Sequence, residues 1–259
     1  MRTPRPQSIV NLLALIATIA INALANTLPL NGQTTGNISN RYDVLFVPAG
    51  YVFSIWSVIY LGLIGFVVYQ LLPAQRGNAR LNRLGWLFAL SCVFNVGWLF
   101  AWHYEQFALS VALMLALLAT LIICYNTLEI GQRAVSTAER WLMQAPFSVY
   151  LGWITVATIA NITTVLNAYN WSGWGVSAVA WTIVLLAVGV ALAAAFKLGR
   201  GDNLYLLVLV WAFAGIAIKH ADTPIVTSAA WIATALVAAL LFVPPRRPRR
   251  GLIRMGAAA

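Results

Sequence analysis

Eight stretches of predominantly apolar residues divide this 259-residue chain, and they constrain its fold more than any other feature. A run of about 20 apolar residues can cross the hydrocarbon core of a bilayer as a helix. Backbone groups in lipid must be hydrogen-bonded within their own segment, so each run is predicted to be an α-helix. The expected fold is all-α, a polytopic integral membrane helix bundle of about eight transmembrane helices. The predicted spans are residues 9–28, 49–72, 84–102, 107–128, 146–166, 176–196, 204–218 and 225–243.

The composition agrees with this interpretation. Hydrophobic residues make up 61% of the chain, charged residues 8%, and the mean hydropathy is +0.83. Most of the polar side chains are needed in the loops, so few remain to cover a water-exposed surface. We therefore expect the lipid bilayer to be the surroundings of this protein.

The net charge of +10 would suit a nucleic-acid partner, but the distribution of the basic residues argues against one. If eight spans place both termini on one side, every Lys and Arg except Arg41 and Lys219 falls on that side. An excess of Lys and Arg marks the cytoplasmic loops of membrane proteins. We expect cytoplasmic termini, a bacterial inner membrane and no nucleic-acid partner. The arginines of residues 246–254 are interpreted as topology anchors, with contact to anionic headgroups as the alternative.

Three of the predicted spans each carry a face of aromatic and amide side chains. At about 100° per residue, positions spaced by three, four, seven or eight residues share one face of a helix. Lipid-facing surfaces need only aliphatic residues, so these faces are expected to line one cavity inside the bundle. Ordinary core packing is the alternative for each ring. The candidate binding residues are Phe53, Trp56 and Tyr60 on the second span, Asn95, Trp98 and Trp102 on the third, and Trp153, Ala157 and Asn161 on the fifth.

Other polar features of the spans and loops have plainer explanations. Asparagines along the first span, such as Asn11 and Asn22, must face other helices, and structural hydrogen bonding is favoured over ligand contact. His103 and His220 lie at predicted helix ends, where a surface position is favoured over iron ligation or a proton relay. The long outer loop of residues 29–47 is expected to fold over the mouth of the bundle. No nucleophile elbow, phosphate-binding glycine motif or zinc spacing is present, so no enzyme is expected.

Three motifs in this chain resemble those of one family. The segment VPAGYVFSIWSVIY, residues 47–60, is similar to the signature that opens the second helix of the TspO/MBR family of tryptophan-rich sensory or translocator proteins. FNVGWLF, residues 94–100, and WITVATIAN, residues 153–161, resemble its motifs on the third and fifth helices. Ala49 and Tyr51 depart from the family's second proline and its tryptophan. The matching residues are Pro48, Gly50, Val52, Phe53, Trp56, Tyr60, Asn95, Trp98, Trp153, Ala157 and Asn161.

The resemblance covers roughly residues 9–167 and implies a five-helix bundle that binds porphyrins, related tetrapyrroles or sterols and acts as a sensor or regulator. We accordingly divide the chain into residues 1–167, a TspO/MBR-like bundle, and residues 168–259, three additional transmembrane helices with a basic cytoplasmic tail. Together they are expected to form one membrane domain. The added helices are a departure from the five-helix family pattern.

The predicted function is a membrane receptor or sensor for a planar apolar ligand, a tetrapyrrole first and a sterol-like molecule second. Trp56, Trp98 and Trp153 would supply ring faces, while Asn95 and Asn161 would bond polar substituents. No cofactor is required, and a porphyrin or haem-type tetrapyrrole is the expected ligand. A small-molecule transporter and a structural subunit of a membrane complex are the alternatives. The expected partners are the bilayer and the apolar ligand, with a homodimer left open.

Overall fold

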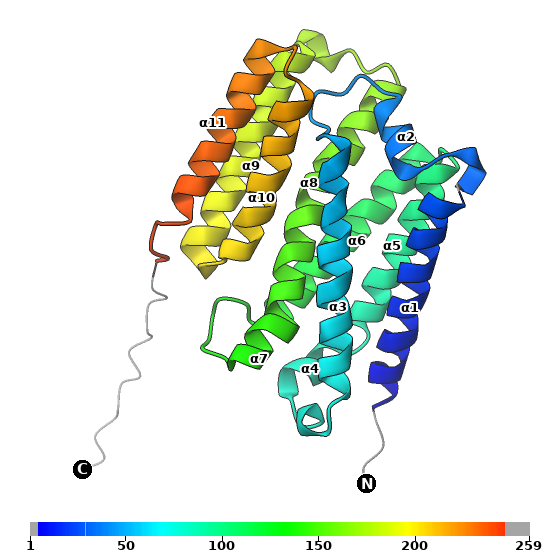
Figure 1. Ribbon diagram of the computed structural model, residues 1–259, viewed down its shortest axis with the longest axis vertical. Helices are drawn as coiled ribbons and strands as arrows, with labels where there is room; N and C mark the ends of the chain where they lie inside the picture. The colour runs from blue at the N-terminus through cyan, green and yellow to red at the C-terminus, as the bar shows by residue number, and fades with distance from the viewer. Residues whose placement is uncertain (1–4, 29, 247–259) are drawn as a thin grey trace.

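The computed structural model describes residues 5–28 and 30–246, and this part of the chain is helical without a strand (Figure 1). Eight long helices follow the eight predicted spans closely, which confirms the all-α membrane bundle. Short helical turns lie between them: η1 (Leu30–Gly32), α2 (Thr35–Asn40), η2 (Gly50–Ser54), η3 (Pro73–Gln75), α4 (Ala79–Leu84), α7 (Thr137–Glu139), η4 (Arg140–Gln144) and η5 (Gly173–Gly175). The long helices are α1 (Pro6–Thr27), α3 (Ile55–Leu71), α5 (Leu87–His103), α6 (Phe107–Thr127), α8 (Ala145–Ala168), α9 (Ala178–Arg200), α10 (Asn203–Lys219) and α11 (Pro224–Leu240).

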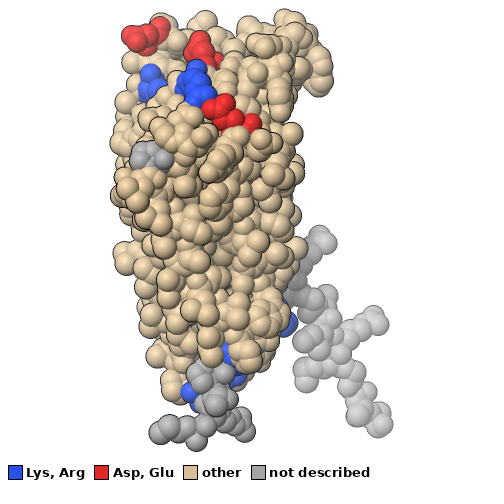
Figure 2. Space-filling model, turned by 90° about the vertical axis from the view of Figure 1, so that its right-hand side faces the viewer, with Lys and Arg blue, Asp and Glu red and all other residues tan. Residues whose placement is uncertain are grey.

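The lengths of these helices suit a membrane. Five apolar helical segments, which include α1, α3, α6, α8 and α9, have at least 18 residues and are long enough to cross a membrane. The helices α5, α10 and α11 have 17 residues each, or about 26 Å at 1.5 Å per residue, at the lower end of the range for a span. Figure 2 shows one face of the molecule with charged residues near its two ends and a broad uncharged band between them. This band is the surface expected in contact with lipid.

The last three helices are packed onto the first five through α10. Helix α10 lies against α8, while α9 and α11 pack on α10 and on each other (Figure 1). Gly152 on α8 allows the close approach, because a Cβ there would lie only 3.1 Å from Cβ of Val208. Small residues at such contacts let membrane helices approach closely. The backbone N–H of Ala49 also donates to the carbonyl of Gly215 on α10, at 3.1 Å.

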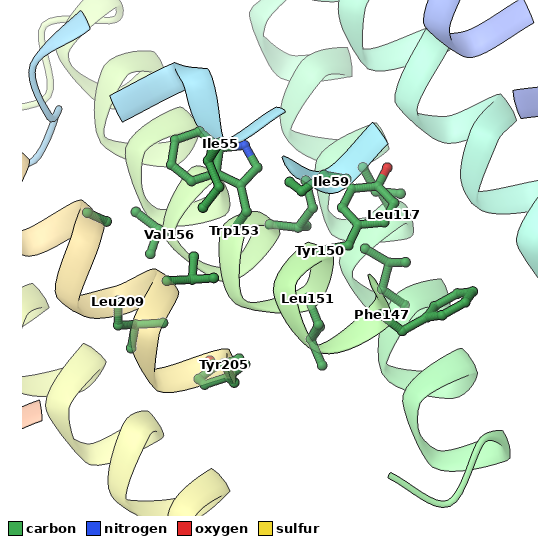
Figure 3. Close-up of a cluster of buried hydrophobic side chains, with 14 of the residues drawn as sticks. Ile55, Ile59, Leu117, Phe147, Tyr150, Leu151, Trp153, Val156, Tyr205 and Leu209 are labelled. Carbon is green, nitrogen blue, oxygen red and sulfur yellow. The ribbon is translucent and has the colours of Figure 1, made fainter. Parts of the chain in front are cut away.

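A single apolar core joins the two groups of helices. Figure 3 shows α8 in the middle of this core, with Trp153 beside Ile55 of α3 and Val156 on the side of Leu209 of α10. The last three helices therefore share buried surface with the helices that carry the aromatic motifs.

Two asparagines of α1 bond to neighbouring helices. The Asn11 amide donates to Oε1 of Gln70 on α3 at 3.1 Å, and the Asn22 amide donates to Oδ1 of Asn95 on α5 at 3.0 Å. Asn95 in turn donates to the Tyr150 hydroxyl on α8 at 3.1 Å. These buried bonds fix α1, α3, α5 and α8 relative to one another, which is the structural role favoured from the sequence.

A lidded aromatic cavity as the candidate functional site

A small cavity lies between α3, α5, α6 and α8 near the end of the bundle that carries α2. Its volume is about 50 Å³. All the predicted binding residues except Tyr60 and Asn95 line it, so three helix faces that are far apart in the sequence meet at one place. The lining residues are Thr35, Ser39, Pro48, Phe53, Trp56, Trp98, Trp102, Met114, Trp153, Val156, Ala157, Ala160, Asn161 and Thr164.

The aromatic rings of the cavity contact one another. Trp153 meets Phe53 edge to face, with ring centroids 5.6 Å apart and an interplanar angle of 83°. Trp98 and Trp102 are stacked at 5.9 Å with an angle of 20°. Edge-to-face and offset stacked pairs are the favourable arrangements for aromatic rings. Part of the ring surface that would face a ligand is thus covered by other rings.

Three polar atoms of the cavity residues are buried without a hydrogen-bond partner. They are Nε1 of Trp98, Nε1 of Trp153 and Oδ1 of Asn161, whose residues are 9%, 2% and 4% exposed. The Asn161 amide nitrogen is used, since it donates to Oγ of Ser110 at 3.1 Å. Buried polar groups are nearly always hydrogen-bonded, so these two donors and one acceptor are available to water or to a ligand in the cavity. A ligand with both acceptor and donor groups would satisfy them.

Tyr60 and Asn95 lie next to the cavity but do not line it. Tyr60 stacks on Trp56 with ring centroids 5.4 Å apart and an angle of 22°. Asn95 is 1% exposed, and both ends of its amide are occupied by Asn22 and Tyr150. The structure therefore places Asn95 in the interhelical network beside the cavity and not in its wall.

Several lining residues were not among the candidates from the sequence. Val156, Ala160 and Thr164 continue the face of α8 that starts at Trp153, with spacings of three, seven and eleven residues. Helical periodicity alone would have found them. Met114 on α6 had no such signal, because one methionine in an aliphatic helix does not show which face points inward.

The loop between α1 and η2 covers the cavity. Thr35, Ser39 and Pro48 belong to this loop or its end and line the cavity. The Trp102 indole donates to the carbonyl of Thr35 at 3.3 Å, which ties the loop to a ring of the cavity wall. The segment from Leu30 to Val47 is called the lid from here on. This arrangement agrees with the expected cover over the mouth of the bundle.

Polar contacts fasten the lid to the turn after α5. The Arg41 guanidinium forms an ion pair of 2.6 Å with Oε1 of Glu105, and Gln33 donates to the same oxygen at 3.3 Å. The Arg41 hydrogen bond is the main reason that the pKa of Glu105 lies below its ordinary value of 4.5, because it stabilises the carboxylate. The Asn31 amide donates to the carbonyl of His103 at 3.0 Å. These polar contacts therefore hold the lid against the C-terminal end of α5 and the turn that follows it.

The two histidines have structural contacts. Nδ1 of His103 lies 2.8 Å from the carbonyl of Leu99, and its ring is fully buried. Nε2 of His220 lies 3.3 Å from the carbonyl of Val47 at the end of the lid. Among the described residues, no group of three or more His, Cys, Asp or Glu could hold a metal ion. The surface position expected for His103 is therefore wrong, because its ring lies inside the bundle and bonds to the carbonyl of its own helix.

The size of the cavity limits what it can hold in this conformation. Sites for drug-sized ligands measure roughly 300–1,000 Å³. A volume of about 50 Å³ admits water-sized groups but no tetrapyrrole. Binding of a flat ligand would require the rings of Trp56, Trp153 and Phe53 to separate and the lid to move outward. In this structure the cavity is closed by the rings and by the lid.

Comparison with known protein families agrees with the motifs. A family model described as TSPO-like protein matches residues 8–243, including the last three helices, whereas the motifs themselves end before residue 167. Searches of curated proteins and of solved structures gave no match. Because the family match covers most of the chain, the protein belongs to the TSPO-like family, a group of membrane proteins of the sensor or transporter type.

Proposed function

We propose that this protein is a membrane receptor that binds a planar, largely apolar ligand in the cavity between α3, α5 and α8. The observation that carries this proposal is the set of three unpaired polar atoms, on Trp98, Trp153 and Asn161, in a wall made mostly of rings and aliphatic groups. A tetrapyrrole is the first candidate, since it offers flat apolar surface for the rings together with polar edge groups. A sterol-like molecule is the second.

The proposal includes a conformational step. The closed cavity is much smaller than a tetrapyrrole, so binding would select or induce a state with the lid raised and the rings apart. Such a step suits a sensor, because occupancy of the cavity would be converted into a change at the outer surface. The protein would act without a cofactor and without catalysing a reaction.

A transporter is the second candidate, and one contact favours it. Val52, in the turn that leads into α3, accepts a hydrogen bond of 3.1 Å from the Trp211 indole on α10. The next residue, Phe53, lines the cavity. A movement of the last three helices would therefore reach the cavity wall directly, as alternating access requires.

Binding and flux measurements on the same preparation separate the two functions. Purified protein in nanodiscs is titrated with protoporphyrin IX while Trp fluorescence is recorded, and proteoliposomes are tested for protoporphyrin movement. Saturable quenching without flux supports the receptor, and flux above that of empty liposomes supports the transporter. The absence of saturable quenching would contradict a tetrapyrrole ligand.

The proposed setting is a bacterial inner membrane with both termini in the cytoplasm. In Figure 1 the start of α1 and the end of α11 both point towards the side of the bundle that carries α4 and α7. Among the described basic residues, Arg41 and Lys219 lie at the opposite end, on the lid and at the end of α10. Much of the arginine-rich tail, residues 247–259, lies outside the described residues. A homodimer stays open as an alternative to a monomer.

A further inference from the structure

A second and larger cavity lies on the other side of α8, between α8 and α9. Its volume is about 360 Å³, within the range of small-molecule sites. It shares no lining residue with the closed aromatic cavity. Helix α8 contributes neighbouring faces to the two, with Asn161 on one side and Ile162 and Thr163 on the other.

The walls of this cavity are suited to a hydrocarbon chain. Both helices contribute aliphatic side chains, among them Ile159 and Leu166 from α8 and Leu185 from α9. The lining positions on α8 extend from Ile159 to Asn167, which is about 12 Å along a helix axis. Thr163 and Thr182 donate their hydroxyl hydrogens to carbonyls of their own helices, so they add little polarity.

The outer end of the cavity is aromatic and polar. Trp171 and Trp181 lie there with ring centroids 5.5 Å apart, and the Trp181 indole donates to the carbonyl of Gly173 at 3.0 Å. Tryptophans of this kind mark the level of the lipid headgroups. Asn167 and Ser172 complete the rim. A molecule in this cavity would thus have its chain at the depth of the outer leaflet and its head at the interface.

The rim carries one acidic side chain without an ion-pair partner. Asp43, on the lid, lines the cavity and forms no hydrogen bond or ion pair in the described part of the chain. Lys219 is within electrostatic range, but its ammonium group donates to Oδ1 of Asn40 at 3.1 Å. His220 is also near, and burial lowers the pKa of its ring below 6.5, so that it is neutral at pH 7. The carboxylate of Asp43 is therefore open to a cationic group.

From these features we infer that the cavity between α8 and α9 binds an amphipathic organic amine, with a hydrocarbon chain along Leu166 and Leu185 and its ammonium group at Asp43. The ammonium would donate to the carboxylate and lie near the ring of Trp171, where a cation–π contact adds attraction. The chain would enter from the outer leaflet between the two helices. Because the lid also covers the aromatic cavity, the amine would contact the same segment that a ligand of that cavity must displace.

The test uses the full chain in nanodiscs, labelled with 5-fluorotryptophan and followed by ¹⁹F NMR. Dodecylamine, dodecanol and dodecanoate are titrated at pH 7, and each titration is corrected for partition into empty nanodiscs. We expect saturable shifts of the Trp171 and Trp181 resonances, with dodecylamine binding roughly three- to tenfold more tightly than dodecanol. Dodecanoate binding as tightly as dodecylamine would overturn the assignment of the head group.

Two pairs of variants locate the site. Asp43→Asn should remove the preference for the amine, whereas Asp222→Asn, at another exposed acid of the outer surface, should keep it. Leu185→Trp should fill the cavity and abolish the shifts, whereas Val184→Trp, at the adjacent lipid-facing position that is 48% exposed, should not. Unchanged binding in Leu185→Trp, or an unchanged preference in Asp43→Asn, would overturn the proposal. An unshifted Trp153 resonance in each free variant shows that the bundle is folded.

Discussion

The indole of Trp153 on α8 meets the indole of Trp56 on α3 edge to face, with ring centroids 6.3 Å apart and an interplanar angle of 83°. This contact closes the wall of the aromatic cavity on the side of α3. A flat ligand cannot lie between the two rings unless one of them turns or the helices separate. The two residues that the sequence motifs predict as ligand contacts thus close one side of the cavity in this structure.

Replacing Trp153 by Phe separates ligand binding from packing. The variant keeps a ring but loses the unpaired Nε1 donor and some stacking area. If Trp153 contacts a flat ligand, the dissociation constant of protoporphyrin IX should rise about two- to tenfold, since aromatic pairs contribute about 0.5–1.5 kcal/mol beyond buried area. Fluorescence titration in nanodiscs measures this change. Trp174→Phe, at an outer ring that is 79% exposed, is the matched control and should leave affinity unaltered.

Asn161→Leu tests the polar side of the same cavity. The change removes the unpaired Oδ1 acceptor and the hydrogen bond to Ser110 while filling a similar volume. Protoporphyrin should bind more weakly, and a sterol should lose less affinity or gain some, because a buried polar group without a partner is disfavoured. Competition between protoporphyrin and cholesterol reports the shift in preference. Equal ratios in wild type and variant, with folding intact, would mean that Asn161 does not face the ligand.

Glu105→Gln should loosen the lid. The variant loses the ion pair with Arg41, so opening becomes easier, and both association and dissociation of protoporphyrin should be faster, by about fivefold at most for an exposed pair. Stopped-flow quenching measures both rates. Glu129→Gln, which removes an ion pair with Arg83 away from the lid, is the control and should leave the rates unchanged.

Acid should reproduce the effect of Glu105→Gln. The pKa of Glu105 is lowered in the folded protein, so its carboxylate stabilises the closed lid above pH 4.5, and this stabilisation is lost as the pH falls through the lowered value. Rates in wild type should therefore rise below pH 4.5 and approach those of the variant. A wild type whose rates stay constant to pH 3 would show that the ion pair does not hold the lid.

The sequence predicts the helices of this protein better than it predicts the cavity. Apolar length and loop charge are properties of each segment alone, and they place all eight long helices within a few residues. Helical periodicity also places Trp153, Ala157 and Asn161 on one inward face. It cannot show how far apart the faces lie, which depends on the packing of α3 against α8. The sequence therefore does not predict the small volume of the closed cavity.

Asn95 illustrates the same limit for a single residue. It shares a helix face with Trp98, which lines the cavity, and a family motif contains both. Whether its amide faces a ligand or a neighbouring helix depends on Asn22 of α1 and Tyr150 of α8, which are 73 and 55 residues away along the chain. No local pattern contains that information.

Asn95→Leu should accordingly reduce stability more than ligand affinity. It removes the hydrogen bonds to Asn22 and Tyr150, at a cost of about 1–2 kcal/mol for interhelical bonds inside a membrane protein. Denaturation in mixed micelles of SDS measures the loss. Asn26→Leu, at an exposed residue whose amide bonds within its own helix, should cost much less. Unchanged stability together with weakened porphyrin binding would instead make Asn95 a ligand contact.

Gly215→Val tests whether the last three helices control the cavity. A Cβ at Gly215 would collide with Val52 and lie 3.3 Å from Cβ of Pro48, so α10 must move away from the turn that leads into α3. Overpacking of this kind costs about 1–3 kcal/mol. Because Pro48 also lines the cavity, we expect weaker protoporphyrin binding in addition to lower stability.

The control for this variant is Gly199→Ala on α9, where an added Cβ meets no atom within 4 Å. It should keep wild-type affinity and gain up to about 1 kcal/mol of stability, since alanine favours a helix more than glycine does. Thermal unfolding and fluorescence titration on the same samples give both quantities. If Gly215→Val loses stability but binds protoporphyrin as tightly as wild type does, the last three helices support the bundle without acting on its cavity, and the transporter alternative loses the contact that favours it.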